Sequence, residues 1–235
     1  MNFRGWKKTS LIEYPGRIST VLFTGSCNFR CPFCYNRDLV LSPEKLPLIK
    51  GSEVLEYLAE NRNLYHAVVF TGGEPTINKD LPEFLGKVKK LGYLVGIETN
   101  GTNPQMLEKL IKNRVLDFVG MDIKAPLTWD KYKTAAGIKS RRLFENVKKS
   151  VRILLKSGID YEFRTTVVPG IHEEKDIVAI AGQLKGAKRY VLQQFLPKNT
   201  IDEKFCGLTP FPDKTLVNLR KRIKGNFGIC EIRNI

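Results

Sequence analysis

Short runs of apolar and β-branched residues alternate along the chain with longer amphipathic segments. The short runs predict six strands, at residues 18–24, 66–71, 93–99, 117–123, 161–168 and 190–196. The amphipathic segments predict helices, at 51–61, 81–91, 104–113, 141–157, 173–185 and 213–224. Regular alternation of strands and helices requires right-handed crossovers and produces a parallel sheet. The pattern therefore predicts an α/β fold.

No linker, repeat or change in composition divides this pattern. We therefore expect residues 1–235 to form a single domain, with a core at about 16–197 and a C-terminal helix and tail at 198–235. A chain of this length with 42% hydrophobic residues can bury one sizeable core.

Polar residues gather where the predicted strands end. They are Cys27 and the segments 71–74, 98–100, 122–124 and 164–166. In βα barrels the C-terminal ends of the strands carry the active site, whereas a flat doubly wound sheet binds ligand only at its switch point. Five consecutive strands that contribute to one rim favour a curved sheet. The expected architecture is a partial (β/α)6 barrel.

The composition is basic, with a formal net charge of +15 and a pI of about 9.6. Most of the lysines and arginines have the spacing of solvated helix faces, and no stripe of arginines and aromatic residues indicates single-strand binding. Nucleic-acid binding is therefore not favoured, although the charge can steer an acidic partner. No apolar run is long enough for a membrane span. With no signal sequence in residues 1–20, the cysteines are expected to be reduced and the protein cytoplasmic.

The densest chemical signal is Cys27, Cys31 and Cys34, spaced Cys-x3-Cys-x2-Cys. Three thiolates on one loop can bind three irons of a [4Fe–4S] cluster and leave the fourth iron without a protein ligand. A zinc site would need a second half, and neither the histidines nor Cys206 and Cys230 have paired ligand spacing. Disulfides would need an oxidising compartment. An open cluster is therefore favoured, and Cys206 and Cys230 are interpreted as ordinary thiols.

The cysteine motif, together with G-G-E-P at 72–75, resembles the radical S-adenosylmethionine (SAM) enzymes. Further segments narrow the resemblance to the glycyl-radical-enzyme activases, and within them to the activating proteins of anaerobic ribonucleoside-triphosphate reductase. These segments are S-L-I-E-Y-P-G at 10–16, C-Y-N-R at 34–37, E-T-N-G at 98–101 and M-D-I-K-A-P at 121–126. The similarity extends over residues 11–197.

The resemblance implies roles for the residues of these motifs. Cys27, Cys31 and Cys34 would bind the cluster, and SAM would bind to its open iron. The cofactor-binding residues would be Phe33 against the adenine, Asn36, Gly72 and Gly73 at the methionine end, Glu74 at the ammonium group, and Glu98, Asp122, Lys124 and Arg164. For Phe33 the alternative is a core aromatic, and for Lys124 and Arg164 it is a surface ion pair.

Glu98 and Asp122 match acids that hold a monovalent cation in the pyruvate formate-lyase activase. Because that relative has Asp where this chain has Glu98, a contact to the ribose is an equal interpretation.

The resemblance also implies a reaction and its partners. One electron from the cluster, supplied by a low-potential donor such as flavodoxin or ferredoxin, would cleave SAM reductively to methionine and a 5′-deoxyadenosyl radical. The radical would remove a hydrogen atom from a glycine of a glycyl radical enzyme, of which anaerobic ribonucleotide reductase is the favoured candidate. The alternatives are a small-molecule radical SAM enzyme, such as a 7-carboxy-7-deazaguanine synthase, and a tRNA-modifying or nucleic-acid-binding protein.

Overall fold

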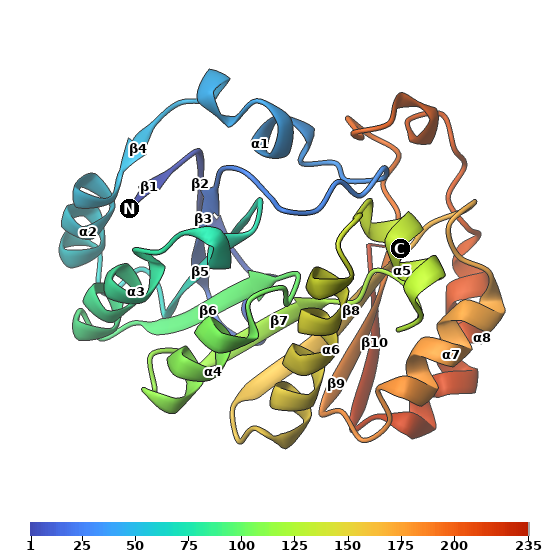
Figure 1. The fold of residues 1–235 in the computed structure, drawn as a ribbon. Coiled ribbons are helices and arrows are strands. Elements are labelled where there is room, and N and C mark those ends of the chain that lie inside the picture. The colour runs from blue at the N-terminus through green and yellow to red at the C-terminus, as the bar shows by residue number, and fades with distance from the viewer. Residues whose placement is uncertain (235) are drawn as a thin grey trace.

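The computed structural model, which describes residues 1–234, is built around an eight-stranded sheet with the strand order β10-β9-β8-β7-β6-β5-β3-β2 (Figure 1). All six predicted strands are present: β3 (Ser19–Thr24), β5 (Ala67–Gly72), β6 (Leu94–Thr99), β7 (Phe118–Asp122), β8 (Asp160–Val167) and β9 (Arg189–Gln194). Each pairs in parallel with the next one along the chain.

The two edge strands of the sheet were not predicted. β2 (Gly5–Ser10) pairs antiparallel with β3, and β10 (Ile229–Arg233) pairs in parallel with β9. β2 contains the exposed residues Lys7 and Lys8, so its pattern lacks the apolar run of a central strand. The segment after the sixth strand is thus more than a helix and a tail, because it also completes the sheet. A small second sheet pairs β1 (Asn2–Phe3) with β4 (Ile49–Lys50).

The six predicted helices are α2 (Gly51–Glu60), α3 (Leu81–Lys90), α4 (Pro104–Lys112), α6 (Arg141–Lys156), α7 (Glu174–Gln183) and α8 (Asp213–Ile223). Two shorter helices, α1 (Arg37–Leu41) and α5 (Trp129–Ala136), were not predicted. α4 begins as expected, because the Asn103 side chain accepts a hydrogen bond from the backbone N–H of Met106. Within residues 1–234, no helix is both long and apolar enough to cross a membrane.

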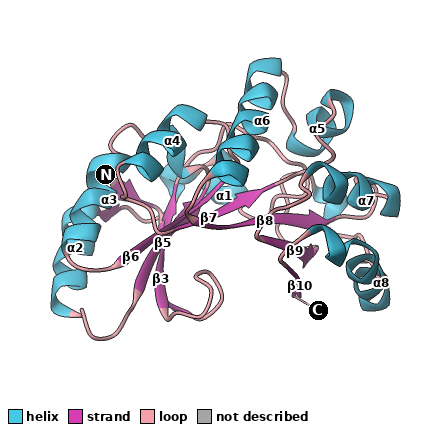
Figure 2. Ribbon diagram, turned by 90° about the horizontal axis from the view of Figure 1, so that it is seen from below, coloured by secondary structure: helices cyan, strands magenta, loops and turns pink. Residues whose placement is uncertain are grey.

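The sheet is curved, and its helices lie on the outer, convex side (Figure 2). Successive side chains of a strand point to opposite faces, so Val68 and Phe70 pack in the large core under the helices. Val69 of the same strand joins a smaller cluster with Tyr14 and Phe118 on the concave side. The expected α/β fold with a curved parallel sheet is confirmed, and its concave face is available for a functional site.

Candidate active site

The three cysteines lie on one loop that leaves the C-terminal end of β3, as the sequence predicts (Figure 1). The loop is fastened from two directions by backbone hydrogen bonds. The N–H of Arg30 donates to the carbonyl of Ala136, the last residue of α5. From the C-terminal segment, the N–H of Ile201 donates to the Cys34 carbonyl at 3.1 Å. Segments far apart in the sequence therefore hold the cysteine loop in place.

All three thiols are free and at least partly buried. Burial raises the pKa of Cys27 to about 11 and that of Cys31 to about 12, while the nearby Lys124 ammonium lowers both. The Cys27 sulfur also accepts hydrogen bonds from the Phe29 N–H at 3.4 Å and from the Asn100 amide at 3.8 Å. These two donors and Lys124 can stabilise negative charge on the Cys27 sulfur. Burial also raises the pKa of Cys34, which the Lys124 ammonium and the backbone N–H of Asn36 lower.

The donor set fits a [4Fe–4S] cluster bound by three protein ligands. Thiolate sulfur is the ligand that such clusters take, and Cys27, Cys31 and Cys34 are free thiols on a single loop. Each thiolate of a cubane binds its own iron, so the sulfurs need not meet at one point. In residues 1–234 no three His, Cys, Asp or Glu side chains are arranged around a single metal ion.

Gly72 and Gly73 bring the end of β5 against the start of the cysteine loop. Gly72 has a φ of +108°, and a Cβ atom there would lie 2.6 Å from the backbone of Thr24. A Cβ atom on Gly73 would collide with the carbonyl of Ser26. The two glycines therefore let the end of β5 pack closely against the backbone of residues 24–26, just before the cysteine loop. The predicted close approach of SAM to these glycines is a separate role.

Glu74 is fully buried and connects the ends of two strands. One of its carboxylate oxygens accepts hydrogen bonds from the Thr76 N–H and hydroxyl and from the Thr99 hydroxyl, and the other accepts from the Asn100 N–H at 2.7 Å. Burial raises the pKa of this carboxyl group, whereas the hydrogen bonds oppose the shift. All four donors belong to the chain itself. In this structure Glu74 therefore holds together the segments that follow β5 and end β6.

Asn36 and Phe33 both lie in or beside the cysteine loop. The Asn36 side-chain amide donates to the Gly72 carbonyl at 3.3 Å and so joins the loop to β5. Phe33 is only 5% exposed, with its ring near those of His172 and Phe205. This packing fits the alternative of a core aromatic, while a contact to adenine stays a prediction.

The predicted charged residues converge on the concave face at the ends of β6, β7 and β8. Glu98 accepts from Arg164 through one oxygen and from the Thr71 hydroxyl, at 2.8 Å, through the other. Lys124 forms an ion pair with Asp122 at 2.8 Å. Burial lowers the pKa of Lys124, but the attraction of Asp122 and the cysteines outweighs it and leaves the pKa raised. The ion pair of Arg164 with Glu98 is not a surface pair, because these side chains are 5% and 17% exposed. The pair of Lys124 with Asp122 is half-exposed, because the Lys124 side chain is 18% exposed and that of Asp122 is 40% exposed.

Glu98 and Asp122, the two predicted ligands of a monovalent cation, each form an ion pair with a cationic side chain of the protein. A monovalent cation would have to compete with Arg164 for Glu98 and with Lys124 for Asp122. Cation binding and a ribose contact both stay predictions.

Three residues at the site were given no role in the sequence analysis, although Asn100 lies in the segment 98–100 that it places at a strand end. Asn100 contacts Cys27, and its amide also donates to the side chain of Asn28 at 2.8 Å. Buried His172 accepts from the Val168 N–H and hydrogen-bonds to the Lys124 carbonyl at 2.8 Å. Glu162 binds Arg164 two residues further along β8. The period of two in a strand places 162 and 164 on one face and could have identified this last pair.

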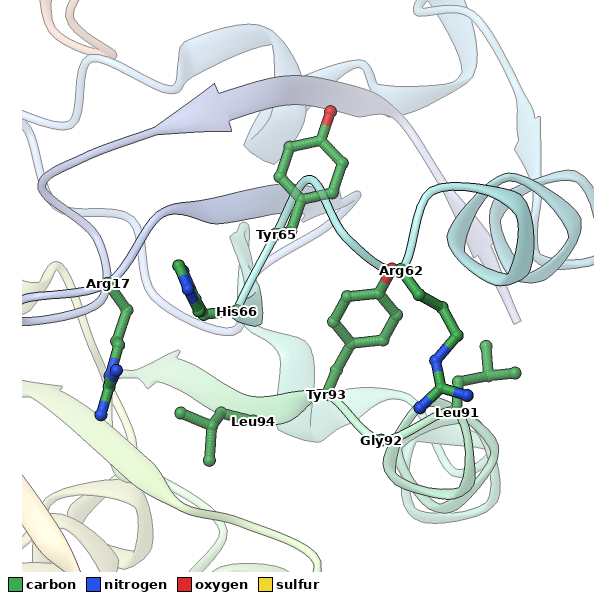
Figure 3. A pocket seen from close by; sticks show the side chains of 8 residues that line it. All are labelled: Arg17, Arg62, Tyr65, His66, Leu91, Gly92, Tyr93 and Leu94. Atoms are coloured by element: carbon green, nitrogen blue, oxygen red, sulfur yellow. The ribbon is translucent and has the colours of Figure 1, made fainter.

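A cavity of about 340 Å³ lies at the opposite edge of the sheet, where β5 and β6 begin (Figure 3). Its lining includes Arg17, Arg62, His66 and the rings of Tyr65 and Tyr93. It contains none of the predicted site residues and is separate from the cysteine loop, which follows the other end of β3.

Comparison with known proteins agrees with this geometry. A protein of Methanocaldococcus jannaschii named "Putative glycyl-radical enzyme activating enzyme" is 37% identical over 232 residues, which cover 96% of this chain and 93% of that protein. The pyruvate formate-lyase-activating enzyme of Clostridium pasteurianum is 30% identical over 81% of this chain and 79% of its own length. The crystal structure of QueE from Escherichia coli has a similar fold, with a TM-score of 0.58 at 16% identity, covering 97% of this chain and 92% of that one.

The family model for the radical SAM superfamily matches residues 21–181, which include the cysteine loop and the ends of strands β3 to β8. Proteins of this superfamily use a [4Fe–4S] cluster and SAM. The matched region and the three-thiol loop at the rim of a curved parallel sheet lead to one conclusion: the chain belongs to the radical SAM superfamily.

Proposed function

We propose that this protein is an activase that generates a glycyl radical on a partner enzyme. The observation that carries the proposal is the similarity to the M. jannaschii protein named for such an activity, which extends over 96% of the chain. The similarity to a pyruvate formate-lyase-activating enzyme supports the same reaction class. The motif resemblance favours anaerobic ribonucleotide reductase as the partner, with flavodoxin or ferredoxin as the electron donor.

When bound, the cluster and SAM would supply a one-electron reductive cleavage to methionine and a 5′-deoxyadenosyl radical, and this radical would take one hydrogen atom from the partner's glycine Cα. The protein holds, orients and shields these groups. Cys27, Cys31 and Cys34 bind the cluster. Gly72 and Gly73, with the Asn36 side chain bonded to the Gly72 carbonyl, line the site beside the cluster. Lys124 and Arg164 supply positive charge where the carboxylate of SAM would bind.

Glu74 acts on the cofactor through its neighbours in this proposal. Its carboxylate fixes Thr99 and the backbone of Asn100, and the Asn100 amide in turn reaches Cys27. The carboxylate therefore fixes the rim that faces the cluster, and a direct bond to the ammonium group of SAM would require some of these donors to be released.

The recruitment of the partner follows from charge. The chain has a net charge of +15, so an acidic partner would associate faster at low salt than at high salt. A folded protein is a large substrate, and in the part of the chain that the structure describes the helices that cover the sheet lie on its convex side, opposite the concave face (Figure 2).

The reaction can be followed by isotope transfer. The partner reductase is produced with glycine deuterated at Cα and is incubated anaerobically with this protein, SAM and a strong reductant. We expect 5′-deoxyadenosine to carry one deuterium, measured by mass spectrometry, because the hydrogen atom comes from the glycine. If 5′-deoxyadenosine stays unlabelled while a small molecule such as a 7-deazaguanine precursor is consumed in equal amount, the small-molecule alternative is correct and the activase proposal is wrong.

A further inference from the structure

Two carboxylates flank a glycine on the concave face of three neighbouring strands, β6, β7 and β8 (Figure 1). The register pairs Glu98 of β6 with Gly120 of β7, and Gly120 in turn with Glu162 of β8. Ile97 and Val119, which precede the first two, pack in the core under the helices. Because side chains alternate along a strand and paired residues share a face, all three positions belong to the concave side.

The guanidinium group of Arg164 lies in the space that Gly120 leaves open. It donates through Nε to Glu162 and through Nη1 to Glu98, so one side chain bridges the two carboxylates. A Cβ atom at position 120 would lie 2.9 Å from Nη2 and 3.0 Å from Cζ of Arg164. A Cβ atom at such a short distance forces its neighbour to move. The bridge therefore depends on the missing side chain at position 120.

Arg233 on β10 holds the outer end of this bridge. It donates to both oxygens of Glu162, at 2.6 and 2.9 Å, in the geometry of a bidentate pair. Glu162 is fully buried, so the two arginines that bind it compensate its charge where water does not. Arg233 also lies 3.6 Å from Glu231 of its own strand. The C-terminal strand is thus connected to the centre of the concave face through Glu162.

Glu98 is the inner end of the bridge and its most accessible carboxylate. Its side chain is 17% exposed, whereas that of Arg164 is 5% exposed and that of Glu162 is fully buried. One Glu98 oxygen accepts from Arg164 and the other accepts from the Thr71 hydroxyl at 2.8 Å. A movement of the guanidinium group would therefore release the carboxylate that faces the proposed cofactor site.

We propose that Gly120 and Arg233 are positioning residues, which hold the Arg164 guanidinium group across β7 and thereby fix the Glu98 carboxylate at the cofactor site. Gly120 provides the space for the guanidinium group, and Arg233 holds the carboxylate of Glu162 that anchors it. The effect on SAM binding rests on the proposed function, whereas the coupling of these two residues to Arg164 does not.

Alanine at position 120 tests the space that the guanidinium group occupies. In the anaerobically reconstituted protein, Gly120→Ala should lower the affinity for SAM about tenfold in equilibrium dialysis, the effect of one lost charge-assisted hydrogen bond. The iron content should not change, because the cysteine loop is not altered. Gly96→Ala is the matched control, since Gly96 is another glycine of the sheet and its Cβ would lie 3.3 Å or more from apolar side-chain atoms. It should keep the wild-type affinity.

A double-mutant cycle determines whether Gly120 acts through Arg164. In the Arg164→Gln background the guanidinium group is absent, so the further change Gly120→Ala should lower neither the affinity for SAM nor the unfolding temperature. In the wild-type background the same change should lower both. Losses of equal size in the two backgrounds would show that alanine disturbs the sheet in another way, and would overturn the role of Gly120.

Glutamine and lysine at position 233 test the outer end of the bridge without a change in the central strands. Arg233→Gln removes both of its bonds to Glu162, which then draws Arg164 toward itself, so the affinity for SAM should fall while the iron content stays constant. Arg233→Lys restores the charge and should recover part of the affinity. Arg220→Gln is the matched control, because Arg220 also binds β10, through the Cys230 carbonyl at 2.7 Å. It should behave like the wild type.

The outcomes separate this proposal from the activase function. Wild-type affinity for SAM in Gly120→Ala or in Arg233→Gln overturns the role of that residue. A loss in Arg220→Gln as large as that in Arg233→Gln shows that β10 acts only as a structural support, which also contradicts the proposal. If the affinities change as expected and no partner enzyme acquires a glycyl radical, only the activase function is wrong.

Discussion

Cys31→Ala is expected to abolish assembly of the iron–sulfur cluster. Each of the three thiolates serves one iron, and Cys31 is the most deeply buried of them, so no water or other side chain can replace it without rearranging the loop. After anaerobic reconstitution, iron and sulfide analysis should give about four irons per wild-type chain and almost none in the variant. Cys27→Ala and Cys34→Ala should behave in the same way.

Cys230 provides a matched control for this experiment. It is a buried thiol like Cys31, 7% exposed, but it lies on β10, away from the loop. Cys230→Ala and Cys206→Ala should therefore retain the full iron content. Complete cluster assembly in Cys31→Ala, or its loss in Cys206→Ala, would show that the ligand assignment is incorrect.

Arg164→Gln is expected to have the largest effect on stability among the charged residues of the site. Arg164 lies between Glu98 and Glu162, and its removal leaves the buried Glu162 carboxylate and the half-buried Glu98 carboxylate with fewer partners. Breaking a buried ion pair by removing one partner costs about 3–5 kcal/mol. Urea unfolding of the apoprotein at pH 7.5 should show this loss, and SAM affinity of the reconstituted protein should fall as well.

The matched control for Arg164→Gln is Arg222→Gln, in which an exposed ion pair with Glu174 is lost. Such surface pairs contribute at most about 1 kcal/mol. The double variant Arg164→Gln with Glu98→Gln should recover part of the lost stability, because Arg164 is the cationic partner of Glu98 and the charge left without it is removed as well. Equal stability of Arg164→Gln and Arg222→Gln would mean that the ion pairs of Arg164 with Glu98 and Glu162 do not stabilise the protein as described.

Much of the fold follows from local sequence patterns. All six central strands and six main helices could be predicted, because buried parallel strands are short apolar runs and the helices that cover them are amphipathic. The same pattern predicted that several polar residues lie at one edge of the sheet, since the C-terminal ends of parallel strands meet there. These residues are the three cysteines, Gly72, Gly73 and the four charged residues at the strand ends.

The contacts that depend on the edges of the sheet could not be predicted. Arg233 reaches Glu162 only because β10 adds to the sheet, and five residues of mixed polarity give β10 no clear strand signal. The path of the loop at residues 11–18 depends on the packing of Tyr14 against Phe118, which no local pattern encodes. Likewise the hydrogen bonds that occupy Glu74 come from Thr76, Thr99 and Asn100, and only the three-dimensional structure brings these together.

The most direct test of the activase function is electron paramagnetic resonance of the partner enzyme. Reduced protein, SAM and anaerobic ribonucleotide reductase from the same cell are mixed without oxygen and frozen. The account predicts a glycine-centred doublet that requires SAM, disappears with Cys31→Ala, and is lost when the radical glycine of the reductase is replaced by alanine. If no glycyl radical enzyme of that cell gives the doublet under conditions in which the protein cleaves SAM, the proposed function is contradicted.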